Sequence, residues 1–92
     1  MNKDELIKEI VIRTGNSQKD VAEVINTFTY IVAECVARQE KVKLVGFGTF
    51  ESKHRAAREG RNPKTGEIVK IAATDVPVFK PGKAFKDACA DD

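Results

Sequence analysis

Basic side chains are concentrated between residues 53 and 70 of this 92-residue sequence. This stretch has six lysines and arginines against two glutamates, so its local net charge is +4, whereas the whole chain carries only +2. Lysine and arginine neutralise phosphate groups and release their counterions, so a local basic stretch predicts a polyanionic partner. The basic residues are Lys53, Arg55, Arg58, Arg61, Lys64 and Lys70.

Groups that could catalyse a reaction are sparse. The single histidine, His54, has no serine or cysteine nucleophile beside it, and no pair of carboxylates stands out. Cys35 and Cys89 lack the further cysteine or histidine ligands of a metal site. Reduced, buried thiols are the expected state, although counting cysteines leaves a disulfide open. We therefore expect no enzyme, no metal ion, no cofactor and no small-molecule substrate.

Two amphipathic helices are expected in residues 1–40. Asn2 is a good N-cap and Gly15 a helix stop, which together predict a helix over 3–13. The next apolar residues recur at helical spacing on one wide face and predict a longer helix over 18–39.

The pattern changes to strands after residue 40. Val42 and Leu44 alternate with lysines, which predicts a half-buried strand. A turn-rich segment, Gly60–Gly66, separates two extended legs near 53–61 and 66–75. Legs of about nine residues reach roughly 30 Å, more than the radius of so small a domain. The hairpin is therefore expected to project as an arm.

The chain then returns to the body of the domain. Val76–Phe79 is expected to form a strand either at a sheet edge or with a break in its ladder, because Pro77 has no N–H for a central ladder. A short helix is expected over 83–90. No run approaches the roughly 18 apolar residues of a membrane span, and acidic residues near the start disfavour a secretory leader. We expect an intracellular protein with no membrane partner.

The phase of the arginines in the arm leaves two arrangements open. Lys53, Arg55 and Arg61 are in phase along an extended strand, whereas Arg58 is out of phase. Either Arg58 points to the other side, or a bulge near residues 56–57 realigns it and lines three arginines along one surface. A two-stranded ribbon of this kind fits a DNA groove.

Pro63 at the tip of the arm also has two interpretations. As a turn residue it fixes φ and needs no further role. As a compact apolar side chain at the end of a basic arm, it could insert between base steps from the minor groove and kink the duplex. Asn62 beside it could hydrogen-bond to base edges in the same groove.

The sequence resembles the bacterial histone-like DNA-binding family of HU and integration host factor. The resemblance extends over essentially the full length, because its motifs begin at the first three residues and end near residue 84. It is carried by Gly46–Phe50, Arg55, Arg58, Gly60–Gly66, Val76–Phe79 and Gly82–Ala84.

The resemblance implies an α+β fold in an intertwined homodimer. The single domain, 1–92, would have a two-helix dimerisation base over 1–40 and, over 41–92, a three-stranded antiparallel sheet with a long β-hairpin arm and a short C-terminal helix. The arm would span about 53–75. The implied function is non-sequence-specific, architectural DNA binding in the cytoplasmic nucleoid, with DNA bent and compacted through the minor groove and Pro63 intercalated.

The implied partners are double-stranded DNA and a second copy of the chain. Bent, nicked or gapped DNA should be preferred, because its deformation energy is lower. On the body, Lys3 and Lys83 match family positions that hold flanking DNA, with Lys80 and Lys86 assisting. The DNA-binding residues on the arm are Lys53, Arg55, Arg58, Arg61, Asn62, Pro63, Lys64 and Lys70.

A core shared between two chains also follows from size. Without about 20 arm residues, the remaining 70 or so form a core that is marginal alone. Sharing it between two chains is the natural remedy, and a core within one chain is the alternative. The expected shared residues are Phe28, Ile31, Phe47, Phe50 and Phe79.

Two other functions are alternatives at this point. A sequence-preferring relative of the integration-host-factor type would carry the same arm. An RNA-binding or protein-scaffolding module is less favoured, because the arm lacks the aromatic side chains that stack on single-stranded bases.

Overall fold

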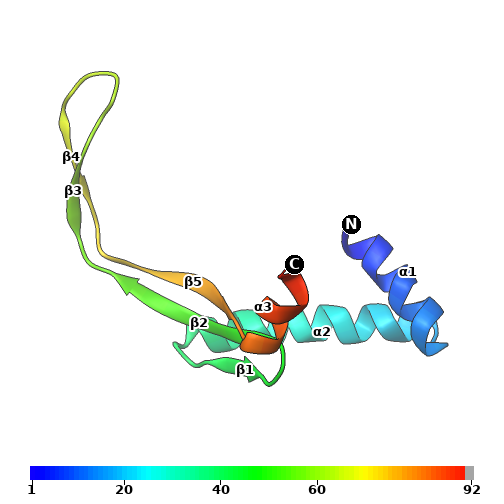
Figure 1. Cartoon of the computed structure of the whole chain (residues 1–92). Helices are drawn as coiled ribbons and strands as arrows, with labels where there is room; N and C mark the ends of the chain where they lie inside the picture. Colours follow the sequence, from blue (N-terminus) through cyan, green and yellow to red (C-terminus); the bar gives the residue numbers. More distant parts are fainter. Residues whose placement is uncertain (91–92) are drawn as a thin grey trace. The chain divides into compact units, whose positions relative to one another are not determined.

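The computed structural model describes residues 1–90 (Figure 1). The chain forms two compact units that divide between Glu34 and Cys35. The first unit contains α1 (Lys3–Thr14) and most of α2 (Gln18–Ala37). The second contains the strands and α3 (Lys83–Cys89). The predicted helices are confirmed to within two residues at each end.

Local capping explains where α1 begins and ends. The Asn2 side chain accepts a hydrogen bond from the Glu5 N–H, at 2.9 Å, and satisfies one of the free donors of the first turn. Gly15 closes the helix with φ 77°, a left-handed conformation that glycine adopts without steric cost.

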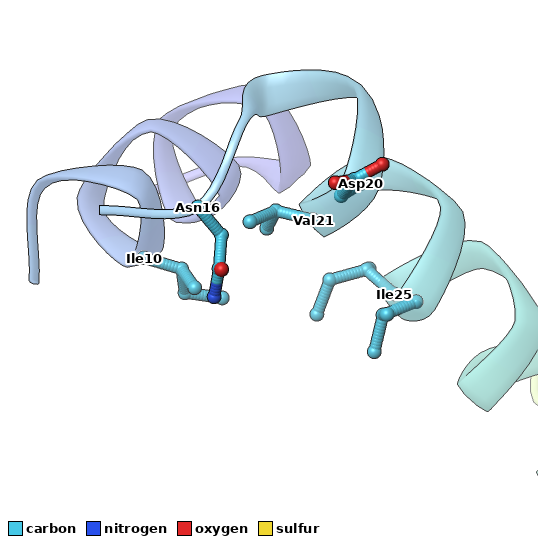
Figure 2. Close-up of a pocket in the computed structure, with 6 residues that line it drawn as sticks. Ile10, Asn16, Asp20, Val21 and Ile25 are labelled. Carbon is cyan, nitrogen blue, oxygen red and sulfur yellow. The ribbon is translucent and has the colours of Figure 1, made fainter. Parts of the chain in front are cut away.

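The first unit buries little of its apolar surface. Ile7 of α1 and Val21 of α2 are the only buried hydrophobic residues among positions 1–90. Ile10 faces Val21 and Ile25 across an open hollow of about 300 Å³ (Figure 2). The apolar stripe of α2 is therefore incompletely covered within this unit.

The second unit is built on a three-stranded antiparallel sheet with strand order β1-β2-β5. Its strands are β1 (Val42–Leu44), β2 (Gly48–Arg55) and β5 (Thr74–Pro81). β5 is an edge strand, so the edge position predicted from Pro77 is confirmed. Gly48 is required by packing: a Cβ there would lie only 2.5 Å from the Phe79 ring and 2.6 Å from the Lys80 carbonyl oxygen.

Four phenylalanines form an aromatic cluster on this unit. Phe79 is at its centre, with ring centroids 5.1 Å from Phe47, 4.8 Å from Phe50 and 6.0 Å from Phe85. The structure therefore brings together three of the residues predicted for the shared core, and adds Phe85 of α3. Phe28 and Ile31 belong to the first unit.

The hairpin continues from β2 and β5 into the arm through a second, two-stranded ladder (Figure 1). That ladder pairs β3 (Arg58–Arg61) with β4 (Ile68–Ile71). Arg55 pairs with Thr74 before the interruption, and Arg58 pairs with Ile71 after it. Two residues are therefore left unpaired on each strand between these pairs. Because the number is the same on both strands, the pairing register is unchanged and neither strand has an extra residue. A bulge that realigns Arg58 is excluded.

Candidate nucleic-acid interface

The tip of the arm is a tight, internally bonded turn. The Asn62 N–H donates to the Glu67 carbonyl at 2.8 Å, and the Gly66 N–H donates to the Asn62 carbonyl at 2.7 Å. The Asn62 side-chain oxygen accepts from the Lys64 N–H at 2.9 Å. Gly66 has φ 74°, which favours glycine. These bonds hold the chain in a compact turn.

Pro63 follows Asn62 in this turn, and its side chain is exposed. A proline has no N–H to satisfy, so the turn accommodates it without losing a hydrogen bond. The turn interpretation of Pro63 therefore fits the geometry, and the exposed ring is also accessible to a partner. Asn62 is half-buried, and its side-chain oxygen is engaged within the turn.

The basic residues of the arm are divided between two faces. Paired residues share a face and successive residues alternate, so Arg58 lies with Ile71 and Arg61 lies on the other face with Ile68 and Lys70. Of the two arrangements left open for Arg58, the structure therefore has the one in which Arg58 points to the other side, because Arg58 and Arg61 are three positions apart in a regular strand. Both faces are exposed over most of their length.

One face of the three-stranded sheet carries a group of lysines. Thr49 pairs with Lys43 of β1 and with Lys80 of β5, so these residues share a face. Glu51 and Lys53 follow at two-residue steps along β2 and lie on the same side. Lys41, just before β1, joins them through an ion pair with Glu51. We call this surface the lysine face; its members are Lys41, Lys43, Lys53 and Lys80, all exposed.

The opposite face of the same sheet is apolar. Phe50 pairs with Val42 on one side and with Phe79 on the other. Leu44 shares this face, two residues after Val42. The sheet therefore presents its aromatic side to a core and its lysines to the outside.

Glu51 is the only buried charged residue in the described part of the chain. The Lys80 Nζ donates to Oε1 of Glu51 at 2.8 Å, and the Lys41 Nζ lies 3.5 Å from Oε2. The hydrogen bond from Lys80, aided by the charge of Lys41, holds the pKa of Glu51 below its ordinary value of 4.5. The carboxylate is therefore charged at neutral pH and links β2 to β5 and to the residue just before β1.

Sequence reasoning missed Lys41 and Lys43 as members of the basic surface. Their alternation with Val42 and Leu44 was the available signal, because it places them on the face opposite the core. Of the predicted residues, Lys53 and Lys80 share this face. Arg55, two residues after Lys53 in β2, continues it.

The remaining predicted lysines lie on helices. Lys3 donates a hydrogen bond to the Asn26 side chain at 2.8 Å within the first unit. Lys83 and Lys86 are exposed on α3 in the second unit.

His54 lies on the face of β2 opposite the lysines. Its Nδ1 is 2.9 Å from Asp75 on β5, and Gln39 donates to the second oxygen of Asp75 at 3.0 Å. These contacts link the base of the arm to the end of α2 and assign the histidine a structural role.

Both cysteines are free thiols. Cys35 is half-buried, but Cys89 is exposed, so the prediction of burial is wrong for Cys89: it occupies the last turn of α3. Over residues 1–90 no group of three or more potential metal ligands occurs. No helix within that range is long and apolar enough to span a membrane.

Known proteins have sequences similar to this chain. A family model described as "Bacterial DNA-binding protein" matches residues 1–90. DNA-binding protein HU of Lactococcus lactis subsp. lactis (strain IL1403) is 59% identical over 87 residues, which cover 95% of this chain and 96% of that protein. This chain belongs to the bacterial HU family.

Solved structures of HU proteins agree with the fold. A chain of the Anabaena HU–DNA cocrystal structure is 44% identical, with a TM-score of 0.91 and 98% coverage of both chains. HU from Thermotoga maritima is 33% identical, with a TM-score of 0.70, over 98% of this chain and 100% of that one. The predicted α+β HU fold is confirmed. The HU family consists of architectural DNA-binding proteins and is not known for enzymatic activity, and a homodimeric state fits it.

Proposed function

We propose that this HU-family protein is a non-sequence-specific DNA-binding protein that bends and compacts DNA in the cytoplasmic nucleoid without catalysing a reaction. The observation that carries the proposal is the arm: an exposed two-stranded ribbon, basic on both faces, that ends in an exposed proline. An arm of this length has no folding role of its own. The Anabaena relative in the comparison was crystallised with DNA, which supports the same assignment here.

The distribution of charge on the arm favours insertion into the minor groove. A groove has a phosphate backbone on each side, and Arg58 and Arg61 point to opposite faces of the ribbon. Each arginine can therefore approach a different backbone when the arm lies in the groove. Arginine is also attracted by the strong negative potential of a narrow minor groove. Contacts of this kind position the protein without reading sequence.

Intercalation of Pro63 is the proposed source of bending. The turn at the tip holds the ring at the end of the ribbon, and the hydrogen bonds of the turn are made by Asn62, Lys64, Gly66 and Glu67, not by the ring. Apolar wedges inserted from the minor groove unstack a step at a cost of a few kcal/mol and kink the duplex. Nicked, gapped or already bent DNA lowers this cost, so it is the preferred partner.

A second copy of the chain is the proposed protein partner. Large apolar side chains remain partly exposed: Phe28 is 37% exposed, Phe47 39% and Ile31 49%. A single chain with so little buried surface cannot offset its ordering entropy. A homodimer would cover these residues, with 1–40 as the helical dimerisation base and 41–92 supplying the sheet, the arm and α3.

The roles proposed for the lysines rest on the resemblance to the HU family. Lys53 and Lys70 are proposed to contact phosphates beside the arm, and Lys64 to do so at its tip. Lys3, Lys80, Lys83 and Lys86 are proposed to hold flanking DNA on the body.

The test is fluorescence anisotropy with two random-sequence duplexes of equal length, one intact and one nicked, over a salt series. We expect tighter binding to the nicked duplex and a steep loss of affinity with salt for both. About six phosphate contacts would lower affinity roughly 10³-fold between 50 and 200 mM salt. Weak binding that is equal for both duplexes would refute the proposal.

A further inference from the structure

Glu51 places a negative charge in the middle of the lysine face. Its side chain is only 8% exposed, although the Lys80 and Lys41 side chains that hold it are 62% and 71% exposed. A carboxylate on a surface that meets phosphates is unfavourable for binding, because like charges repel. A buried carboxylate also requires partners to offset its desolvation.

The two lysines satisfy both carboxylate oxygens. The Nζ of Lys80, on β5, lies 2.8 Å from Oε1. The Nζ of Lys41, just before β1, lies 3.5 Å from Oε2. Both ammonium groups are therefore close to an internal anion before any DNA arrives. A lysine that is already paired with a carboxylate must share or give up that partner to neutralise a phosphate, so it gains less from a phosphate than an unpaired lysine does.

We propose that Glu51 is a positioning residue that keeps Lys80 and Lys41 paired across the sheet and thereby limits the number of phosphates that the lysine face neutralises. This inference rests on the proposed DNA binding. It predicts that two exposed lysines on one face contribute unequally: Lys53, outside the Glu51 pairs, contributes more than Lys80. The carboxylate acts as an internal competitor of DNA phosphate.

The expected effect can be given as a salt slope. Each phosphate neutralised on duplex DNA contributes about 0.9 to the slope of log affinity against log salt. The shorter pair, with Lys80, is the stronger one, so Glu51→Gln should release about one lysine. The slope should steepen by about 0.9, and the dissociation constant at 100 mM salt should fall on the order of eightfold.

The experiment compares anisotropy titrations of the full chain against one intact duplex from 50 to 300 mM NaCl. Glu51→Gln is matched by Glu23→Gln, which removes the same charge at an exposed position on α2. We expect the control to keep the wild-type slope. Adding Lys80→Gln to Glu51→Gln should return the slope to the wild-type value, a reversal that a purely structural role would not produce.

A second comparison does not depend on the folding of the Glu51 variant. With Glu51 intact, Lys53→Gln should reduce the slope by about 0.9, and Lys80→Gln by clearly less. Equal reductions, or an unchanged slope in a folded Glu51→Gln protein, would overturn the inference. If the binding of the unmodified protein does not depend on salt, the proposed function fails. If its affinity falls steeply with salt but the variants do not differ in slope as expected, only the role of Glu51 fails.

Discussion

Replacing Arg58 and Arg61 tests whether the two faces of the arm bind independently. The residues lie three positions apart in β3, about 10 Å along an extended strand, and point to opposite faces. Sites this far apart without shared partners have additive effects. If each arginine neutralises one phosphate, Arg58→Gln and Arg61→Gln should each lower the salt slope by about 0.9, and the double variant by about 1.8.

The corresponding loss of affinity follows from the slope. Because the counterion term vanishes near 1 M salt, each single variant should bind roughly eightfold more weakly at 100 mM, and the double variant about 60-fold more weakly. The assay is anisotropy over the same salt series, and thermal melting is the control. Both side chains are exposed, so stability should change by less than about 0.5 kcal/mol.

Two results would refute this reasoning. An unchanged slope in the double variant would place the phosphate contacts elsewhere on the protein. A double variant no weaker than either single variant would mean that the two arginines contact one phosphate from the same side, which contradicts the strand pairing of the arm.

The remaining predictions concern bending, assembly and pH. Pro63→Ala should keep most of the affinity but reduce the bend measured by energy transfer between the ends of a labelled duplex; an unchanged bend angle would remove the wedge. Phe79→Ala removes a ring that contacts three others, so it should lower the free energy of unfolding by about 3–5 kcal/mol and give unfolded or monomeric protein in sedimentation. The control Val45→Ala, at a 95% exposed position, should do neither. A stable Phe79→Ala dimer would contradict the shared core. The lowered pKa of Glu51 adds stability that is fully present above pH 4.5 and is lost as the pH falls through the folded-state pKa. The melting temperature should therefore fall more in acid for the unmodified protein than for Glu51→Gln. Parallel curves of melting temperature against pH for the two proteins would contradict the ion pairs.

Helices, strands and arm were predictable because each has a local signal. Asn2 and Gly15 have side-chain and backbone properties that favour helix ends, and each stands next to a run with helical spacing. The turn residues from Gly60 to Gly66 specify the hairpin in the same local way. The symmetric interruption of the ladder was not predictable, because it depends on both strands skipping the same number of residues.

The site was predicted less completely than the fold for a related reason. Charge density identifies the arm at once, since its basic residues are adjacent in sequence. The lysine face is assembled from three strands, and Lys41 and Lys80 are brought together only by strand pairing and a shared carboxylate. Neither residue is part of a basic run, so composition gives no sign of the cluster.

The same pairing explains why one acidic residue can remain within a basic surface. Removing Glu51 would leave several ammonium groups on one small face with no internal counter-charge, and like charges on neighbouring strands destabilise a sheet. The pairs with Lys80 and Lys41 relieve that repulsion and tie the edge strands to β2. Glu51 therefore opposes phosphate binding while supporting the sheet on which the aromatic core is built. A variant that binds DNA more tightly is expected to fold less stably for this reason, and the two effects should appear together in Glu51→Gln.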